Sequence, residues 1–194
     1  MTTETTTADR TISMTCTPVL VWHSATDIGA TYTFTQTSGA PAAMLGRVGS
    51  DGSINLTNLP ADPAYSDNID IAIMLDTSQL RSQDGTSAVQ GRWAQPDEFS
   101  GNGPVTGYGW FCGTDANGNY SASVIVTIPD MGIYRVGDGE LMINDDTPDN
   151  APAYAYAMGL VLPDYGNYYI TIDPRITSKT SVGIGFMLDE NPSC

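Results

Sequence analysis

Short runs of strand length, separated by turn dipeptides, constrain the fold of this chain most. The runs alternate in polarity or are continuously apolar, as β-strands are: "YTFTQT" from Tyr32, "IDIAIML" from Ile69, "YSASVIVTI" from Tyr120 and "YYITI" from Tyr168. Dipeptides that favour tight hairpin turns stand among them: Asp51-Gly52, Asp84-Gly85, Asn117-Gly118 and Asp138-Gly139. No window has a sustained helical period. The sequence therefore predicts an all-β protein, an antiparallel β-sandwich.

The chain also repeats itself at a constant offset of 88 residues. This offset aligns Trp22 with Trp110, Tyr32 with Tyr120, and the tripeptide that begins at Arg47 with the one that begins at Arg135. We therefore expect a polar N-terminal arm over residues 1–13 and two β modules over about residues 14–103 and 104–194. Two sandwiches in tandem, or one sandwich fused from both modules around a pseudo-twofold axis, are both compatible with the repeat. The marginal stability of small separate domains favours the fused form.

Charge and composition exclude several partners. Seven Lys and Arg residues against 22 Asp and Glu residues give a net charge of -15, which repels nucleic acid and anionic membrane surfaces. No run approaches the roughly 18 apolar residues that span a bilayer, and the first residues lack the features of a secretory signal. We therefore expect a cytoplasmic protein, with export by a route that the sequence does not show as the alternative. Cys16, Cys112 and Cys194 form no metal-binding pattern, and buried free thiols are expected.

The acidic segment "NDDTPDN" stands opposite "NLTNLPADP" of the first module, with Asp145 and Asp146 in place of Leu56 and Thr57, and is a candidate calcium site. Carboxylate and amide oxygens are the ligands that Ca²⁺ prefers. The candidate ligands are Asn144, Asp145, Asp146, Asp149 and Asn150. The segment is similar to the acidic calcium loop of galactose-specific bacterial lectins, and the alternative is a solvated acidic turn.

Tyrosines are concentrated in the second module, where their rings could stack on a sugar or join a protein interface. The candidate ligand-binding residues are Tyr154, Tyr156 and Tyr168. Packing in the core is the alternative interpretation. The single histidine, His23, has no partner motif of a nucleophile or a metal, and we expect it to be a packing residue rather than a catalytic base.

Three segments resemble the PixA/AidA-type bacterial inclusion body proteins: "IDIAIMLDTSQL" from Ile69, "TGYGWF" from Thr106 and "YAYAMGLVLPDYGNYYITIDPRIT" from Tyr154. The most specific element combines Tyr168-Tyr169, Asp173-Pro174 and Ile176-Thr177. The resemblance implies a small bacterial β protein of inclusions or host interaction, without an assigned catalytic site. It supplies no functional residues that could be transferred to this chain.

These observations predict a non-enzymatic, acidic β-sandwich that acts by association with itself, as a homo-oligomer, or with a partner. The chain has one lysine, Lys179, with which to protect an exposed strand edge. The alternative function is a calcium-dependent, lectin-like carbohydrate-binding module that uses the acidic segment and the nearby tyrosines.

Overall fold

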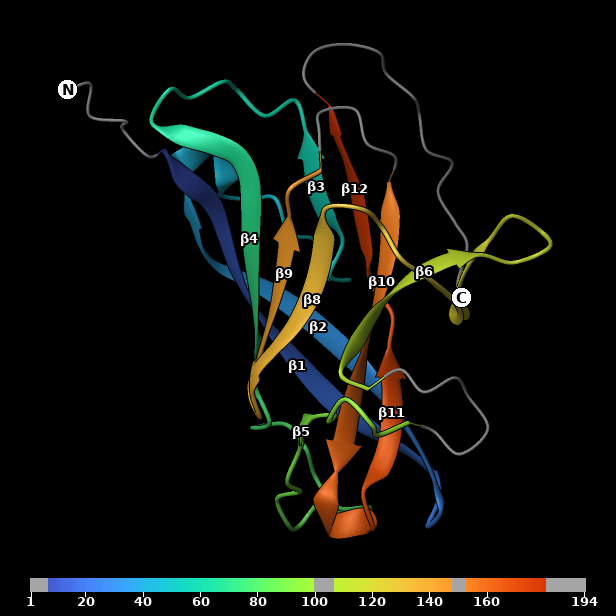
Figure 1. The fold of residues 1–194 in the computed structure, drawn as a ribbon. Coiled ribbons are helices and arrows are strands. Elements are labelled where there is room, and N and C mark those ends of the chain that lie inside the picture. Colours follow the sequence, from blue (N-terminus) through green and yellow to red (C-terminus); the bar gives the residue numbers. More distant parts are fainter. Residues whose placement is uncertain (1–6, 100–106, 148–152, 181–194) are drawn as a thin grey trace.

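The protein is a two-sheet β structure (Figure 1). The computed structural model describes residues 7–99, 107–147 and 153–180, with side chains described as far as Pro174. Within these ranges one sheet has five strands and the other has seven. The predicted all-β class is confirmed, and most strand pairs are antiparallel. Two pairs are parallel, β1 with β4 and β3 with β12, which the sequence did not indicate.

The first sheet, called sheet A, has the strand order β2 (Asp27–Ala40), β1 (Ala8–Ser24), β4 (Tyr65–Leu75), β9 (Glu140–Asp145) and β8 (Met131–Gly137). The second, sheet B, has the order β3 (Ile54–Thr57), β12 (Arg175–Thr180), β10 (Tyr154–Leu162), β6 (Gly109–Thr114) and β7 (Tyr120–Val126). Two further strands also pair with β10, namely β11 (Tyr168–Ile172) and β5 (Arg92–Trp93). Two short 3-10 helices are η1 (Ala42–Met44) and η2 (Pro163–Tyr165).

The core lies between the two sheets. Side chains on successive strand positions point to opposite faces, so the alternating pattern of β4 buries Ile69, Ile71 and Ile73 against the other sheet. The facing side chains of β10 include Met158 and Leu160, which are fully buried in the same cluster. Each such aliphatic side chain contributes roughly 1.5–3 kcal/mol by leaving water.

Strand β10 is buried on both faces, which explains its continuous apolar sequence. On its outer face, Ala155 and Ala157 form a second buried cluster with Trp110 and Cys112 of β6. Ala157 stands directly opposite Trp110 in the β10–β6 register. The small alanines leave room for the indole ring to lie against this face.

Both sheets contain strands from both predicted modules. In sheet A, β4 of the predicted first module pairs with β9 of the predicted second module. In sheet B, β3 and β5 of the first module pair with strands of the second module: β3 pairs with β12, and β5 pairs with β10. The two predicted modules therefore do not form separate sandwiches in tandem. Strand β1 begins at Ala8, inside the range expected to be an N-terminal arm.

The two repeated segments begin alike and then differ. Trp22 and Trp110 both lie in the first strand of an antiparallel hairpin, β1–β2 and β6–β7 respectively. Farther along, Ile54 lies in β3 of sheet B, whereas its counterpart Ile143 lies in β9 of sheet A. The duplication is not confirmed by this arrangement and stays a prediction.

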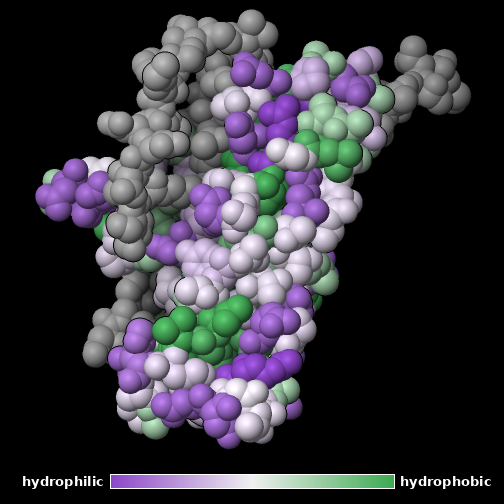
Figure 2. Space-filling model, turned by 180° about the vertical axis from the view of Figure 1, so that it is seen from behind, coloured by the Kyte–Doolittle hydropathy of each residue, from purple (hydrophilic) through white to green (hydrophobic). Residues whose placement is uncertain are grey.

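The outer face of β2 is formed by threonines. Exposed threonines alternate with inward side chains along the strand, at Thr31, Thr33, Thr35 and Thr37. Strands β1 and β2 pass behind β8 and β9 in Figure 1. The view from behind shows a surface of nearly neutral hydropathy across the middle, with hydrophobic patches toward the lower end and in the upper part (Figure 2). Threonine hydroxyls keep this face hydrated without adding to the acidic charge.

Cys16 and Cys112 are buried, as predicted, and the thiol of Cys16 is free, while Cys194 lies outside the described residues. Burial raises the pKa of the Cys16 thiol to about 12, so it stays protonated and unreactive. None of the helices in the described ranges is long and apolar enough to cross a membrane.

Candidate functional site

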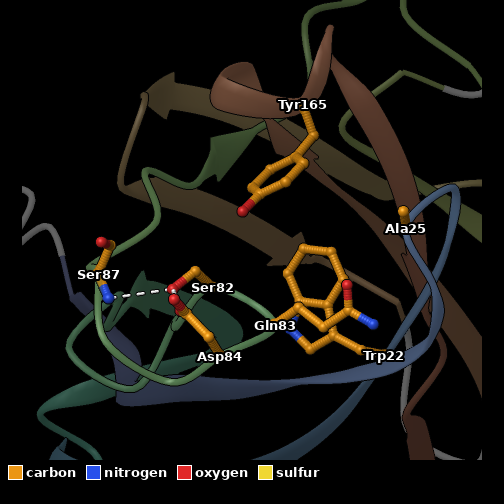
Figure 3. A pocket seen from close by; sticks show the side chains of 7 residues that line it. All are labelled: Trp22, Ala25, Ser82, Gln83, Asp84, Ser87 and Tyr165. Atoms are coloured by element: carbon orange, nitrogen blue, oxygen red, sulfur yellow. Dashed lines mark hydrogen bonds between the residues drawn. The ribbon is translucent and has the colours of Figure 1, made fainter.

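A cavity of about 500 Å³ opens where the β1–β2 hairpin, residues 76–91 and η2 meet, at the lower end of the molecule in Figure 1. Aromatic, polar and small residues from these three parts of the chain line it: Trp22, Ala25, Ser82, Gln83, Asp84, Ser87 and Tyr165. In Figure 3 the two rings lie on one side of the hollow, and the loop that carries Ser82, Asp84 and Ser87 lies on the other. The site thus has an aromatic wall and a polar wall.

The aromatic wall is formed by Trp22 and Tyr165. Their ring centroids are 5.0 Å apart and their planes are inclined by 61°, an edge-to-face contact. Trp22 Nε1 donates a hydrogen bond to the Arg81 carbonyl oxygen at 3.1 Å, which fixes the indole ring against residues 76–91. Both side chains are half-buried, so part of each ring faces the cavity.

Tyr165 is positioned by the local sequence of η2. Pro163 favours the first turn of a helix, and Gly166 ends this one with a left-handed φ of 67°. Asp164 ties η2 to the segment of residues 76–91 that carries the polar wall, because its Oδ2 accepts a hydrogen bond from the backbone N–H of Gln90 at 2.9 Å.

The polar wall is a turn held by its own hydrogen bonds. Ser82 Oγ donates to Asp84 Oδ1 at 2.6 Å and accepts from the backbone N–H of Ser87 at 3.0 Å. The backbone N–H of Thr86 also donates to Asp84 Oδ1, at 3.1 Å. Gly85, with φ of 73°, supplies the left-handed position that the turn requires. These bonds hold the backbone of the loop and the side chains of Ser82 and Asp84 in place.

These bonds keep Asp84 ionised. The hydrogen bond from Ser82, followed by those from Thr86, holds the pKa of the Asp84 carboxyl below its usual range. Beside the carboxylate, the exposed Gln83 presents an amide and the exposed Ser87 a hydroxyl. The lining residues include no histidine, cysteine, lysine or arginine, and the cavity offers hydrogen-bonding groups and aromatic faces.

The structure does not bring the side chains of Asn144 and Asp145 together. Both residues end β9 rather than lying in a loop, and consecutive strand positions face opposite sides of the sheet. Asn144 Nδ2 donates to Asp70 Oδ1 at 2.9 Å on the outer face. Asp145 is buried, and its Oδ1 accepts hydrogen bonds from the Thr147 hydroxyl at 2.6 Å and backbone N–H at 3.1 Å.

The other predicted metal ligands lie farther along the same segment. Asp146 is exposed, and its backbone N–H donates to the Asp130 carbonyl oxygen at 2.9 Å. Asp149 and Asn150 lie outside the described residues. Among the residues that the structure describes, no group of three or more His, Cys, Asp or Glu side chains is placed to hold a metal ion. Calcium binding by this segment stays a prediction.

The predicted ligand-binding tyrosines lie away from the cavity lining. Tyr156 is fully buried, and its hydroxyl donates to the Gly52 carbonyl oxygen at 3.0 Å, so it is a core residue. Tyr168 packs against the core, and its hydroxyl accepts the backbone N–H of Ile28 at 3.1 Å. Tyr154 is half-buried against the same core. His23, expected to pack, is exposed.

Sequence reasoning identified one part of this site and missed the rest. Tyr165 belongs to the tyrosine-rich segment that the sequence singled out, and Asp84-Gly85 was predicted as a turn. Trp22 was identified only as a member of the repeat. No local pattern indicates that Trp22 and Tyr165 meet, because 143 positions separate them in the sequence.

The chain matches no protein-family model, no curated protein and no solved structure. The resemblance to inclusion body proteins is therefore carried by the quoted residues alone. The cavity geometry is the basis for a functional proposal.

Proposed function

We propose that this protein is a non-enzymatic carbohydrate-binding β-sandwich, and that the cavity beside Trp22 and Tyr165 receives a neutral sugar ring. The observation that carries the proposal is the pairing of two partly exposed aromatic rings with a rigid loop that presents a carboxylate, an amide and a hydroxyl. A sugar has an apolar C–H face that packs on aromatic rings and hydroxyl groups that hydrogen-bond to such polar groups.

Charge supports a neutral rather than an acidic sugar. The ionised Asp84 lies in the lining, and the chain as a whole carries a net charge of -15. Both would repel uronic or sialic acid residues. An exposed cavity at one end of the molecule is also accessible to a sugar that belongs to a longer chain.

Quenching of tryptophan fluorescence by acrylamide tests this proposal. The chain has three tryptophans, of which Trp93 and Trp110 are buried, so acrylamide reports mainly on Trp22. A neutral sugar that occupies the cavity should protect Trp22 from quenching. Calorimetry with neutral and acidic oligosaccharides, with and without a calcium chelator, then gives affinity and separates a calcium-dependent site from this one.

Variants assign the binding to the cavity. Tyr165→Ala or Gln83→Ala should weaken binding about tenfold, the equivalent of about 1.4 kcal/mol. Tyr134→Ala, which removes an exposed tyrosine from strand β8, is the matched control and should leave binding unchanged. The proposal is wrong if no neutral sugar binds, or if Tyr165→Ala and Gln83→Ala bind as the unaltered protein does.

A further inference from the structure

Among the described residues, strand β7 ends sheet B and pairs with β6 alone. It pairs with β6, with Phe111 opposite Val126 and Cys112 opposite Ile125. In the described part of the chain, no strand lies along its other edge. An exposed edge presents backbone N–H and C=O groups that a further strand can bind, unless charge, proline or another part of the chain blocks it.

Two other edge strands are partly covered by groups of the chain itself. On β3, the Arg47 guanidinium donates to the carbonyl oxygens of Thr57 at 2.7 Å and Asn55 at 3.4 Å. On β2, the backbone N–H of Phe34 donates to the Ser50 carbonyl oxygen at 2.9 Å. Some backbone groups on these two edges are therefore already bonded.

The edge of β7 lacks the usual protection by charge. No residue from Tyr120 to Pro129 is charged, although the chain has 22 acidic residues. The strand β8, which ends sheet A, has one charged residue, Arg135, and this pairs with Asp138. An uncharged edge strand rich in β-branched residues is prone to pair with another strand.

Exposed apolar side chains gather on the same two strands. Of the eight large hydrophobic residues that are exposed in the described ranges, four lie on β7 or β8. They are Ile125 at 44%, Val126 at 37%, Tyr134 at 56% and Val136 at 58% exposure. Ile125 and Val126 on β7 thus offer apolar area to a strand that pairs along this edge.

We infer that β7 pairs with β7 of a second copy of this chain in an antiparallel arrangement, which joins two copies of sheet B into one continuous sheet. A twofold-symmetric contact sets the same surface patch against itself. Because the strand is uncharged, it meets its own copy without burying like charges, whereas a basic partner would be drawn to the acidic surfaces elsewhere. This inference is independent of the proposed sugar site.

The remaining charge makes the dimer dependent on salt. Each copy carries a net charge of -15, so the two repel at low ionic strength, and salt screens this repulsion. Sedimentation velocity over a range of protein and salt concentrations should therefore show a dimer that strengthens as salt is added. A particle that stays monomeric at every concentration and ionic strength would overturn the inference.

A charged residue on β7 should prevent the pairing. Ile125→Glu sets two like charges near each other in the dimer, and we expect its dissociation constant to rise at least about tenfold. Val136→Glu makes the same change on β8 and is the matched control, expected to dimerise as before. Dimerisation that survives Ile125→Glu, or that Val136→Glu weakens equally, would contradict pairing through β7.

A mixed experiment distinguishes repulsion from misfolding. Ile125→Lys alone should also stay monomeric, but an equimolar mixture of Ile125→Glu and Ile125→Lys should form a heterodimer because the charges are now opposite. Native mass spectrometry separates the heterodimer from the homodimers by mass. Failure of the mixture to associate, while both variants keep the circular dichroism of the unaltered protein, would overturn the proposed pairing through β7.

Discussion

At the scale of single residues, the ion pair of Arg92 and Glu98 links charge to stability. Arg92 Nη1 and Nη2 donate to Glu98 Oε2 and Oε1, each at 2.6 Å, and the Gln95 backbone N–H donates to Oε2 at 2.6 Å. The hydrogen bonds from Arg92 are the main cause that lowers the pKa of Glu98, and partial burial opposes them. Since the folded pKa is the lower one, the pair stabilises the protein above the ordinary pKa of glutamate, and this contribution is lost as the pH falls through the folded value.

Glu98→Gln should therefore lower the free energy of unfolding by about 1 kcal/mol at neutral pH. The difference should vanish in acid, where Glu98 of the unaltered protein is protonated as well. Urea denaturation at a series of pH values measures this. Asp97→Asn removes the neighbouring exposed carboxylate, which forms no ion pair among the described residues, and should change little at any pH. A deficit of Glu98→Gln that is constant with pH would contradict the assignment.

At the scale of elements, the turn at Gly52 shows how a turn is fitted to the core. Gly52 has a left-handed φ of 83°, and a Cβ atom there would lie 2.6 Å from Pro174 Cβ and 2.7 Å from Phe34 Cδ2. Gly85 has a similar φ of 73°, but a Cβ atom there would meet nothing within 4 Å. An alanine at Gly85 would therefore meet backbone strain alone, whereas an alanine at Gly52 would meet both backbone strain and steric overlap.

Gly85→Ala should cost about 1 kcal/mol of unfolding free energy, because alanine disfavours a left-handed φ. Gly52→Ala should cost about 2–4 kcal/mol, because the overlap with Phe34 and Pro174 is added to the same strain. Chemical denaturation measures both values. Equal costs for the two variants would show that Phe34 and Pro174 move aside freely.

The elements also show which features local sequence determines. Alternating polarity located β4, β7 and β11, and the predicted turns at Asp51-Gly52, Asp84-Gly85 and Asn117-Gly118 each have a glycine with positive φ. Strand pairing was not predictable, because a strand pairs equally well with many others until the core selects one. The same reason hid the burial of Tyr156. Alternation places it on one side of β10, but both sides of that strand are covered.

At the scale of the whole molecule, the order in which the chain visits the two sheets decides how the protein can be divided. The chain builds β1 and β2 in sheet A, crosses to sheet B for β3, and returns to place β4 parallel to β1. Later in the chain, β9 pairs with β4 and β10 pairs with β5. Strands in each half of the sequence need strands of the other half to complete their backbone hydrogen bonds. We therefore expect unfolding to be a single cooperative transition.

This connectivity makes the protein a candidate for reconstitution from fragments. Residues 1–103 and 104–194, produced separately, should each lack the sharp near-ultraviolet dichroism of packed aromatic rings. Mixed, they should recover it, because β4 regains β9 and β5 regains β10. A fragment that folds alone would show that one half carries a self-sufficient core. Recovery on mixing would make the chain a split reporter, in which two proteins fused to the halves report their proximity by restoring one β-sandwich.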